Sequence, residues 1–441
     1  MSSGECVFRK SPIIQVGEDE FLLYNPITKT ADLVDYEVIQ ALFDPERLSE
    51  DVFAFLKRHG HLTEKSEADL ERAAAEEYRA AFARFSARPH SYLIPTYNCN
   101  MRCIYCYEKD LRREKKVMDE KTLESFFQAM ESTSSQDVLL YGGEPLQTMT
   151  KPLVEQAAFR CEEMGFSLSV CSNGLELMAF NDIIDVFSSI MITLDGIEPV
   201  QNSRRPQPGR INSFNKVVEN ISYVIGLGKP LTVSVNADAH NINELPALAD
   251  FIISKGWHKK DNAEFVVSHI MQSLNRGYPY ILEPKEAAKK MVELYREYPQ
   301  MEIFLPSIKG SNPLINVFFE REEWRPKYWY CGANCYTLFY DLYGYVYPCY
   351  MVIGRQQFAV GKFHPTLEFF PSLKTWRERS SFSVPQCREC TYSFFCGGGC
   401  LYRQYLRTGS LTDPYCDVLE GLVESYVPFL YEKMKEKGGR L

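Results

Sequence analysis

Eleven of the chain's fourteen cysteines stand in two crowded groups, and their spacing limits the possible folds more than any other feature of the sequence. The first group is Cys99, Cys103 and Cys106, and the second holds eight cysteines from Cys331 to Cys416. Disulfide frameworks seldom crowd cysteines at short gaps twice in one chain, whereas metal sites do. We therefore expect metal chemistry in a reducing compartment, and hence a cytoplasmic protein.

Length and composition are those of a globular protein with more than one domain. At about 150 residues per domain, a chain of 441 residues suggests two or three domains. Hydrophobic residues make up 45% and charged residues 24%, which excludes a disordered or fibrous protein. The formal net charge of −9 argues against nucleic acid and anionic membranes as partners. Neither a secretory signal nor a long uncharged apolar stretch is present, so no membrane span is expected.

Changes in the spacing of apolar residues along the sequence divide the chain into three expected domains, residues 1–88, 89–309 and 310–441. In the first, short strand-like runs precede helical patterns at about 35–42, 49–58 and 66–86. The strand-like runs are Ile13–Val16, Phe21–Tyr24 and Ala31–Val34. The third domain contains the eight-cysteine region and a terminal amphipathic helix near Val418–Lys437.

The middle domain alternates apolar strands with amphipathic helices, which predicts a parallel sheet covered by helices on its outer face. Six strand–helix units fit a partial (β/α)6 barrel better than the complete barrel of eight, so the fold class is α/β. The expected strands are Tyr92–Pro95, Val138–Tyr141, Ser167–Cys171, Ile190–Leu194, Leu231–Val235 and Phe265–His269. The expected helices include Lys121–Met130, Leu153–Glu163, Ser213–Ile225, Glu244–Ile253 and Pro284–Tyr295.

The three-cysteine loop directly follows the first of these strands, where the active sites of parallel barrels collect. Three thiolates are one short of the four that complete a [4Fe–4S] cluster, so one iron would stay open to another ligand. A zinc site would want a fourth protein ligand nearby, and no histidine falls between residues 91 and 239. The spacing C-x3-C-x2-C, with Tyr105 before the last cysteine, resembles the signature of the radical S-adenosylmethionine (SAM) superfamily.

Further matches to this superfamily lie at the ends of the later strands. Glycines let backbone approach a ligand, a carboxylate suits an ammonium group, and arginine suits a carboxylate. By resemblance, Glu144 and the backbone around it hold the SAM amino group, Arg205 binds the SAM carboxylate, and Tyr105 packs near the adenine. Arg204 stands directly beside Arg205 and competes with it for this assignment. The full set of expected SAM-binding residues is Tyr105, Gly142, Gly143, Glu144, Pro145, Ser172, Asn173, Asp195 and Arg205.

The resemblance implies the chemistry. SAM would bind the open iron through its amino and carboxylate groups, and one-electron reduction would release methionine and a 5′-deoxyadenosyl radical. This radical abstracts a hydrogen atom from the substrate, while the protein orients the groups and excludes water. An external one-electron reductant, flavodoxin or ferredoxin, is the implied partner.

The eight-cysteine region resembles the SPASM extension found in part of this superfamily. Eight cysteines match two complete [4Fe–4S] clusters, whereas a double zinc ribbon is the competing interpretation. The resemblance assigns Cys331, Cys335, Cys349 and Cys400 to the first auxiliary cluster. It assigns Cys387, Cys390, Cys396 and Cys416 to the second, which gives three [4Fe–4S] clusters in all. The cysteines left over are Cys6, Cys161 and Cys171, of which the last two are expected in the core.

SPASM proteins act mostly on peptides, so the sequence predicts a peptide maturase that installs a thioether or carbon–carbon crosslink. The N-terminal module resembles the winged-helix-like domain that binds the leader of a ribosomal precursor peptide by β-addition, and a structural cap is its alternative. A sulfatase-type maturase, which oxidises Cys or Ser to formylglycine, is disfavoured by Tyr350 after Cys349, where those enzymes carry an Asp. Peptide epimerisation, and a leader-binding or electron-transfer protein without catalysis, are further alternatives. His269 is expected to be a satisfied core histidine, and the Asp110–Lys116 run a solvated mobile loop.

Overall fold

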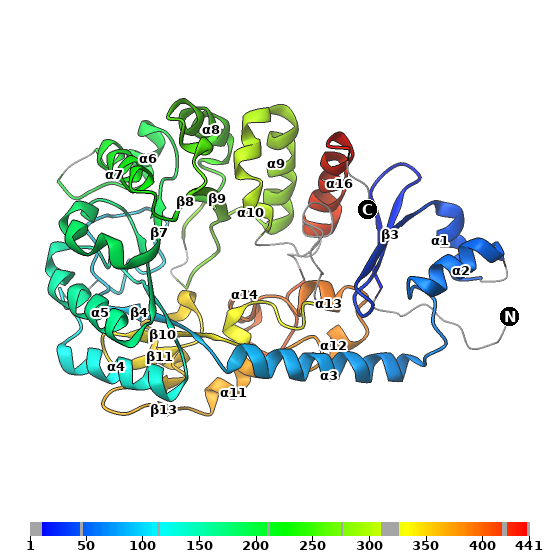
Figure 1. The fold of residues 1–441 in the computed structure, drawn as a ribbon, viewed down its shortest axis with the longest axis horizontal. Helices are drawn as coiled ribbons and strands as arrows, with labels where there is room; N and C mark the ends of the chain where they lie inside the picture. The colour runs from blue at the N-terminus through cyan, green and yellow to red at the C-terminus, as the bar shows by residue number, and fades with distance from the viewer. Residues whose placement is uncertain are drawn as a thin grey trace.

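A ten-stranded sheet forms the centre of the computed structural model, which describes residues 11–44, 47–112, 115–209, 212–274, 277–309, 326–416 and 421–438 (Figure 1). The strand order is β13-β12-β11-β10-β4-β5-β6-β7-β8-β9, and β4 to β9 are parallel neighbours. These six strands confirm the partial barrel expected from the sequence. Their bounds are β4 His90–Ile94, β5 Asp137–Leu140, β6 Ser167–Ser172, β7 Phe187–Thr193, β8 Leu231–Ala237 and β9 Ala263–His269.

The helices between these strands cover the outside of the barrel, as the outer arc of Figure 1 shows. Each buries one apolar face: in α7, for example, Val217, Ile221 and Val224 recur at helical spacing and are fully buried. The helix bounds are α4 Glu120–Ser132, α5 Lys151–Met164, α6 Glu198–Arg204, α7 Phe214–Gly226, α8 Leu245–Ser254, α9 Pro284–Glu297 and α10 Pro306–Lys309. Between β6 and β7 the connection is a 3₁₀ segment, Leu177–Val186, instead of an α-helix.

The N-terminal residues form a three-stranded antiparallel sheet followed by three helices, in the order expected. The bounds are β1 Ile13–Gln15, β2 Phe21–Asn25, β3 Thr30–Val34, α1 Tyr36–Leu42, α2 Glu50–Arg58 and α3 Glu67–Ser86. Asp35, Ser49 and Ser66 each accept a hydrogen bond from the backbone N–H three residues on, which explains why the helices begin there. The winged-helix identity of this module and its boundary after residue 88 stay predictions. Cys6 lies outside the described residues.

Helix α3 leaves the N-terminal sheet and runs along the C-terminal part of the chain (Figure 1). Its buried residues Leu70 and Ala74 pack against Tyr328 and Phe394. The N-terminal sheet also contacts the C-terminal helix α16 (Val427–Glu436), because Glu20 accepts hydrogen bonds from the Tyr431 hydroxyl at 2.7 Å and the Lys435 amino group at 2.9 Å. The N-terminal module and helix α16 are therefore packed together.

The C-terminal part continues the barrel sheet, which the sequence did not predict. Strand β10 lies parallel to β4 through five residue pairs, from Thr337 beside His90 to Asp341 beside Ile94. The other bounds in this part are β10 Thr337–Asp341, β11 Tyr345–Tyr347, β12 Gly361–Lys362, β13 Glu368–Phe369, α11 Ser372–Arg377, α12 Pro385–Arg388, α13 Ser393–Cys396 and α14 Leu401–Thr408. The barrel and the C-terminal part thus share one hydrogen-bonded sheet.

The predicted terminal helix is divided. A π-helical segment, Leu422–Tyr426, precedes α16, and residues 417–420 lie outside the described residues. Helix α16 packs on α9, where the Tyr295 and Phe429 rings stack with centroids 5.3 Å apart. Among the described residues, no helix combines the length and the apolar character needed to cross a bilayer.

Candidate functional site

The three-cysteine loop begins just beyond the carboxyl end of β4 and is held there by backbone hydrogen bonds. Arg102 N–H donates to the Pro206 carbonyl at 2.8 Å, and Ile104 N–H donates to the Arg204 carbonyl at 3.0 Å. These bonds fix the loop to the segment that follows α6. Cys99, Cys103 and Cys106 line one cavity of about 320 Å³ at this end of the barrel.

The three thiols are close enough to act on one another electrostatically. Burial, with a smaller contribution from charge repulsion by Cys103, raises the pKa of Cys99 and of Cys106 to about 12. The Arg112 guanidinium opposes this effect at all three thiols, and its Nη2 donates to Cys106 Sγ at 2.7 Å. Buried thiolates need nearby positive charge, which ligated iron supplies. The donor set therefore fits a three-cysteine iron–sulfur cluster.

The Gly142–Gly143 turn brings backbone against the cysteine loop. Gly142 has φ of +99°, in the range that glycine favours, and a Cβ on Gly143 would lie 2.2 Å from the Asn98 carbonyl oxygen. Gly143 N–H donates to the Thr96 carbonyl at 3.1 Å, and Glu144 N–H donates to the Asn98 backbone carbonyl at 2.8 Å. Any side chain at Gly143 would push the cysteine loop away.

Glu144 ties the ends of two strands together beside the cavity. Its carboxylate accepts hydrogen bonds from Leu146 N–H at 2.9 Å, the Ser172 hydroxyl at 2.7 Å and Asn173 N–H at 2.6 Å. Burial raises the pKa of Glu144 to about 7. Glu144, Ser172 and Asn173 all line the cavity, as expected, whereas Pro145 is buried outside its lining.

Tyr105 joins the Asp195 and Arg205 side chains through its hydroxyl. The hydroxyl donates to Asp195 Oδ2 at 2.5 Å and accepts from Arg205 Nη1 at 2.6 Å. Arg205 lines the cavity, and its buried Nε has no hydrogen-bond partner, so the guanidinium can still bind an anion such as a carboxylate. Asp195 stands behind Tyr105 and orients it without lining the cavity.

Arg204, the neighbour that competed with Arg205 in the sequence, is fully buried in a different network. Its guanidinium pairs with Asp238 at 2.8 Å and with Asp195 at 3.5 Å, and it donates to the Asn236 carbonyl at 3.0 Å. Because its charge is already matched by two carboxylates, Arg204 stabilises the fold, and Arg205 is the arginine available to a ligand.

Several residues of this cavity were not found from the sequence. Arg112 folds back onto the cysteine loop, which makes the prediction of a solvated loop at this residue wrong. Glu108 is buried in the cavity wall, and burial raises its pKa to about 7. Cys171 and His269, both expected in the core, also line the cavity. Both lie in strands that mix apolar and polar residues, so the strand pattern alone did not mark them as cavity residues.

In the C-terminal part, Cys387, Cys390, Cys396 and Cys416 come together as expected. Cys396, Cys390 and Cys416 each act on the Cys387 thiol by charge repulsion. Arg379 organises the glycine turn beside these thiols by donating to the carbonyls of Gly398 and Gly399, each at 2.7 Å. The four thiols fit the second auxiliary cluster.

The structure brings together three of the four cysteines expected at the first auxiliary cluster. The Cys349 thiol is acted on by the Cys331 and Cys400 thiols, and Cys331 by Cys400. Cys335 does not join them: its thiol points to the Phe82 carbonyl of α3, 3.8 Å away. Among the described residues, no three His, Cys, Asp or Glu side chains are placed to hold a single metal ion. In a cluster each thiolate binds a different iron, so the thiols need not converge on one point.

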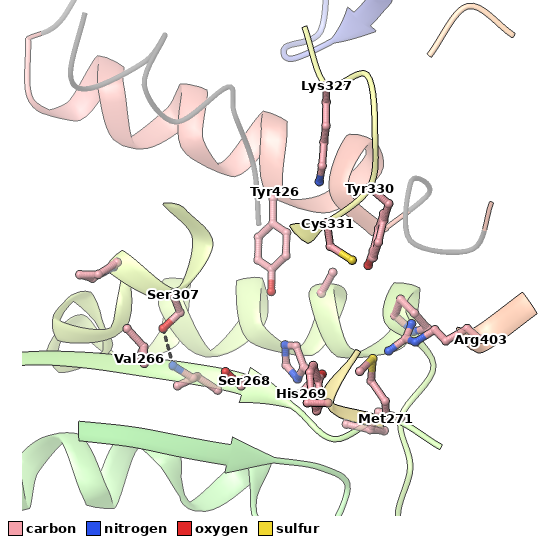
Figure 2. A pocket seen from close by; sticks show the side chains of 16 residues that line it. Val266, Ser268, His269, Met271, Ser307, Lys327, Tyr330, Cys331, Arg403 and Tyr426 are labelled. Atoms are coloured by element: carbon pink, nitrogen blue, oxygen red, sulfur yellow. Dashed lines mark hydrogen bonds between the residues drawn. The ribbon is translucent and has the colours of Figure 1, made fainter. Parts of the chain in front are cut away.

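A second cavity, of about 500 Å³, lies beside the Cys331 thiol. Figure 2 shows Cys331 and the Lys327 amino group on one side of it, facing His269, Met271 and Arg403 on the other. This cavity shares Ser268, His269, Met271 and Tyr350 with the first cavity. The two cavities are therefore neighbours with a common wall formed by the end of β9 and Tyr350.

Comparison with known proteins agrees with this geometry. Residues 93–252 match the Radical SAM superfamily, so this part of the chain is a radical SAM domain, as its cysteine loop indicated. A protein of Archaeoglobus fulgidus, described as uncharacterized, is 22% identical over 357 residues, covering 75% of this chain and 79% of its own length.

Two solved structures share the fold beyond that domain. The structure of anSMEcpe with bound AdoMet has a TM-score of 0.60 and 17% identity, and the match covers 79% of this chain and 100% of that one. Streptococcus suis SuiB bound to precursor peptide SuiA has a TM-score of 0.53 and 15% identity, covering 93% of this chain and 98% of that one. The fold of this chain therefore resembles these two solved structures across most of its length.

Proposed function

We propose that this radical SAM enzyme modifies a ribosomally made precursor peptide and installs a thioether or carbon–carbon crosslink. The observation that carries the proposal is the shared wall of the two cavities. A substrate in the second cavity would lie between the three-cysteine loop and Cys331, because Ser268, His269 and Tyr350 face both spaces. Such a position suits a substrate that meets the SAM site on one side and an electron acceptor on the other.

The residues of the first cavity divide the work of binding SAM. Arg205 would bind the SAM carboxylate, and the Glu144 turn would accept its amino group. Tyr105 holds Arg205 in place through the 2.6 Å hydrogen bond, and Asp195 holds Tyr105. With an iron–sulfur cluster on Cys99, Cys103 and Cys106, the bound SAM supplies a 5′-deoxyadenosyl radical that removes a hydrogen atom from the peptide. The chain's own contribution is orientation and exclusion of water.

The electron balance of a crosslink supports a role for the C-terminal cysteines. Each crosslink removes two hydrogens from the peptide, one as a hydrogen atom and the other as a proton and an electron. An acceptor for that electron is therefore required. The two cysteine groups between Cys331 and Cys416 would hold the auxiliary [4Fe–4S] clusters that supply this capacity, which brings the total to three clusters.

The second cavity favours an anionic group of the peptide. Lys327 and Arg403 line it, and among the residues that the structure describes no Asp or Glu does so. His269 is neutral at physiological pH, because burial and the nearby Arg403 lower its pKa to about 4. An anionic side chain entering the cavity would thus meet two cations without opposing carboxylates.

A groove on the N-terminal module supports recognition of a leader peptide. It has a volume of about 460 Å³ and runs beside β3, an edge strand of the three-stranded sheet. Its floor is apolar and its rim is acidic, which favours a leader with apolar and basic residues added along β3. The match to SuiB, whose solved complex contains its precursor peptide, covers 93% of this chain. The lining residues are Asp19, Glu20, Leu33, Val34, Asp35, Val38, Asp51, Val52 and Phe55.

The alternative reactions differ in product mass or in the presence of an aldehyde, so one experiment separates them. The anaerobically reconstituted chain should be incubated with SAM, dithionite and the short peptide encoded beside its gene. We expect 5′-deoxyadenosine and a peptide lighter by two hydrogens. Formylglycine made from Cys would lose sulfur, and formylglycine made from Ser, which also loses two hydrogens, would carry an aldehyde that reacts with a hydrazide probe. Epimerisation in heavy water would add one deuterium. Each of these results contradicts the crosslink.

The matched control is the variant with Cys99, Cys103 and Cys106 replaced by Ala. It should form no 5′-deoxyadenosine while keeping the irons of the two auxiliary sites, about eight at four per cluster. The intact chain should bind about twelve irons by the same count. A chain that binds about twelve irons but cleaves no SAM with dithionite, or with flavodoxin or ferredoxin as reductant, would refute catalysis. It would then be a leader-binding or electron-transfer protein.

A further inference from the structure

A third cavity, of about 260 Å³, continues from the second one along helix α14. The second and third cavities share Leu282, Pro284 and Arg403, so these residues form the wall between them. The first and second cavities also share a wall, whereas the first and third have no lining residue in common. The three spaces therefore lie in a row that leads from the three-cysteine loop to α14. At the far end the wall is partly apolar, with Ile281 and Leu406.

Arg403 is the charged residue that the second and third cavities have in common. It is half-buried on α14, and Figure 2 shows its side chain across the second cavity from Lys327. Its guanidinium carbon lies 5.7 Å from the centre of the Tyr415 ring. Among the described residues no carboxylate forms an ion pair with this guanidinium, and this includes Glu283, which lines the third cavity. A cation placed in this way favours an anionic ligand.

Lys327, the other cation of the second cavity, already faces acidic groups of the protein. Its ammonium group opposes the rise that burial causes in the pKa of the Cys331 and Cys396 thiols. Arg403 acts on His269 at the other side of the cavity, and His269 is neutral at physiological pH. Thiolates at Cys331 and Cys396 would therefore balance the charge of Lys327, which leaves Arg403 as the cation for a substrate.

We infer that Arg403 recognises an aspartate or glutamate side chain of the precursor peptide close to the residue that is modified, and that the peptide continues from there into the third cavity. This inference rests on the proposed function, because it names a feature of the peptide that the enzyme would modify. The planar guanidinium offers two parallel N–H donors to a carboxylate, which a lysine cannot do. Beyond Arg403, Ile281 and Leu406 offer apolar surface to the next residues of the peptide.

Replacement of charged groups in the enzyme and in the peptide tests the pairing. Each Asp or Glu of the peptide encoded beside the gene is changed in turn to Asn or Gln. One of these changes should lower the wild-type kcat/KM for loss of unmodified peptide about 10- to 150-fold, the contribution of a hydrogen bond to a charged group. Arg403→Gln should show this loss with the original peptide and no further loss with the changed one. Arg79→Gln, at an exposed position on α3, is the matched control and should behave as the wild type does.

Charge reversal separates recognition from a structural effect of the substitution. Arg403→Glu should process a peptide that carries Lys at the same acidic position better than it processes the original peptide, because the two charges are exchanged. A purely structural role of Arg403 would not produce this preference.

Three results would overturn the inference. The peptide can lack Asp and Glu outside its leader, every Asp and Glu can be replaced without effect, or the changed peptide can lose as much with Arg403→Gln as with the wild type. In each case the wild type would still crosslink the original peptide, so the proposed function would stand. A product other than a crosslink would contradict the proposed function, and loss of the unmodified peptide would still report on Arg403. Without any reaction, the Kd of the labelled peptide, from fluorescence anisotropy, gives the same comparison.

Discussion

Two neighbouring arginines give the sharpest test of the SAM site, because they have the same charge and different surroundings. Arg205 lines the cavity with an unpartnered Nε, and Arg204 is fully buried between Asp195 and Asp238. We compare Arg205→Gln with Arg204→Gln. The amide of the first variant can still donate to the Tyr105 hydroxyl, so it removes the charge and keeps the local hydrogen bond.

We expect Arg205→Gln to lower the affinity for SAM and Arg204→Gln to lower the free energy of unfolding. A hydrogen bond to a charged group contributes about 1.5–3 kcal/mol, so Arg205→Gln should weaken SAM binding roughly 10- to 150-fold. Its free energy of unfolding should change little. Arg204→Gln leaves the Asp238 carboxylate buried and unpaired, which costs about 3–5 kcal/mol of stability. Folded Arg204→Gln protein should bind SAM nearly as well as the wild type.

Equilibrium binding of SAM and urea denaturation, both under anaerobic conditions, separate the two effects. The reasoning is refuted if Arg205→Gln is folded and binds SAM with wild-type affinity. It is refuted equally if Arg204→Gln weakens SAM binding while its stability stays at the wild-type level, since Arg204 would then be the ligand-binding arginine.

Three further predictions follow from single positions. Gly143→Ala should abolish 5′-deoxyadenosine formation, since its Cβ would lie 2.2 Å from a backbone oxygen. Gly226→Ala, which has open space around it, should keep this activity. Equal activity of the two variants would contradict the requirement for close backbone contact at Gly143. Burial raises the pKa of Asp341 from 3.8 to about 6, so the folded state holds this proton more tightly than the unfolded state. The stability of the wild type relative to Asp341→Asn should therefore fall by about 3 kcal/mol as the pH rises from about 3 to about 7, measured by urea denaturation, and a constant difference would refute it. Asp51→Lys on the groove rim should weaken binding of a basic leader peptide, measured by a fluorescence anisotropy titration. The control is Glu76→Lys at an exposed position on α3. An equal loss of affinity in both variants would rule out the groove as the binding site.

The sequence predicts elements and loops well where a short pattern determines them. The six barrel strands are nearly continuous apolar runs, so their positions could be read directly, and the cysteine loop follows the first of them. The sequence narrows the SAM-binding arginine to Arg204 or Arg205. Both side chains are buried, and only the carboxylate partners of Arg204 and the place of Arg205 in the cavity lining separate them. The pairing of strands far apart in the sequence cannot be predicted in this way, because nothing in Thr337–Asp341 indicates that this strand pairs with His90–Ile94.

The direction in which a side chain points is the second property that the sequence does not predict. The spacing Cys331-x3-Cys335 is compatible with two ligands of one cluster, and the 3₁₀ turn between them sends the thiols to opposite sides. The contact of Arg112 with the cysteine loop could not be predicted either, because a charged residue in a basic run is ordinarily solvated. His269 and Cys171 line the cavity from strands that mix apolar and polar residues, and which face of such a strand meets the cavity depends on the twist of the whole sheet.

The pairing of β10 with β4 also determines where this molecule can open. A hinge between the barrel and the C-terminal part would have to break a parallel ladder of five residue pairs, so the two cannot swing apart along that side. The opposite border of the sheet is β9, which has no further strand neighbour among the described residues. The second cavity lies along this border, lined by Val266, Val267, Ser268 and His269. The continuous ladder of the β10–β4 side therefore fixes the spacing between the barrel and the C-terminal part, and any opening of the second cavity has to occur along the β9 border.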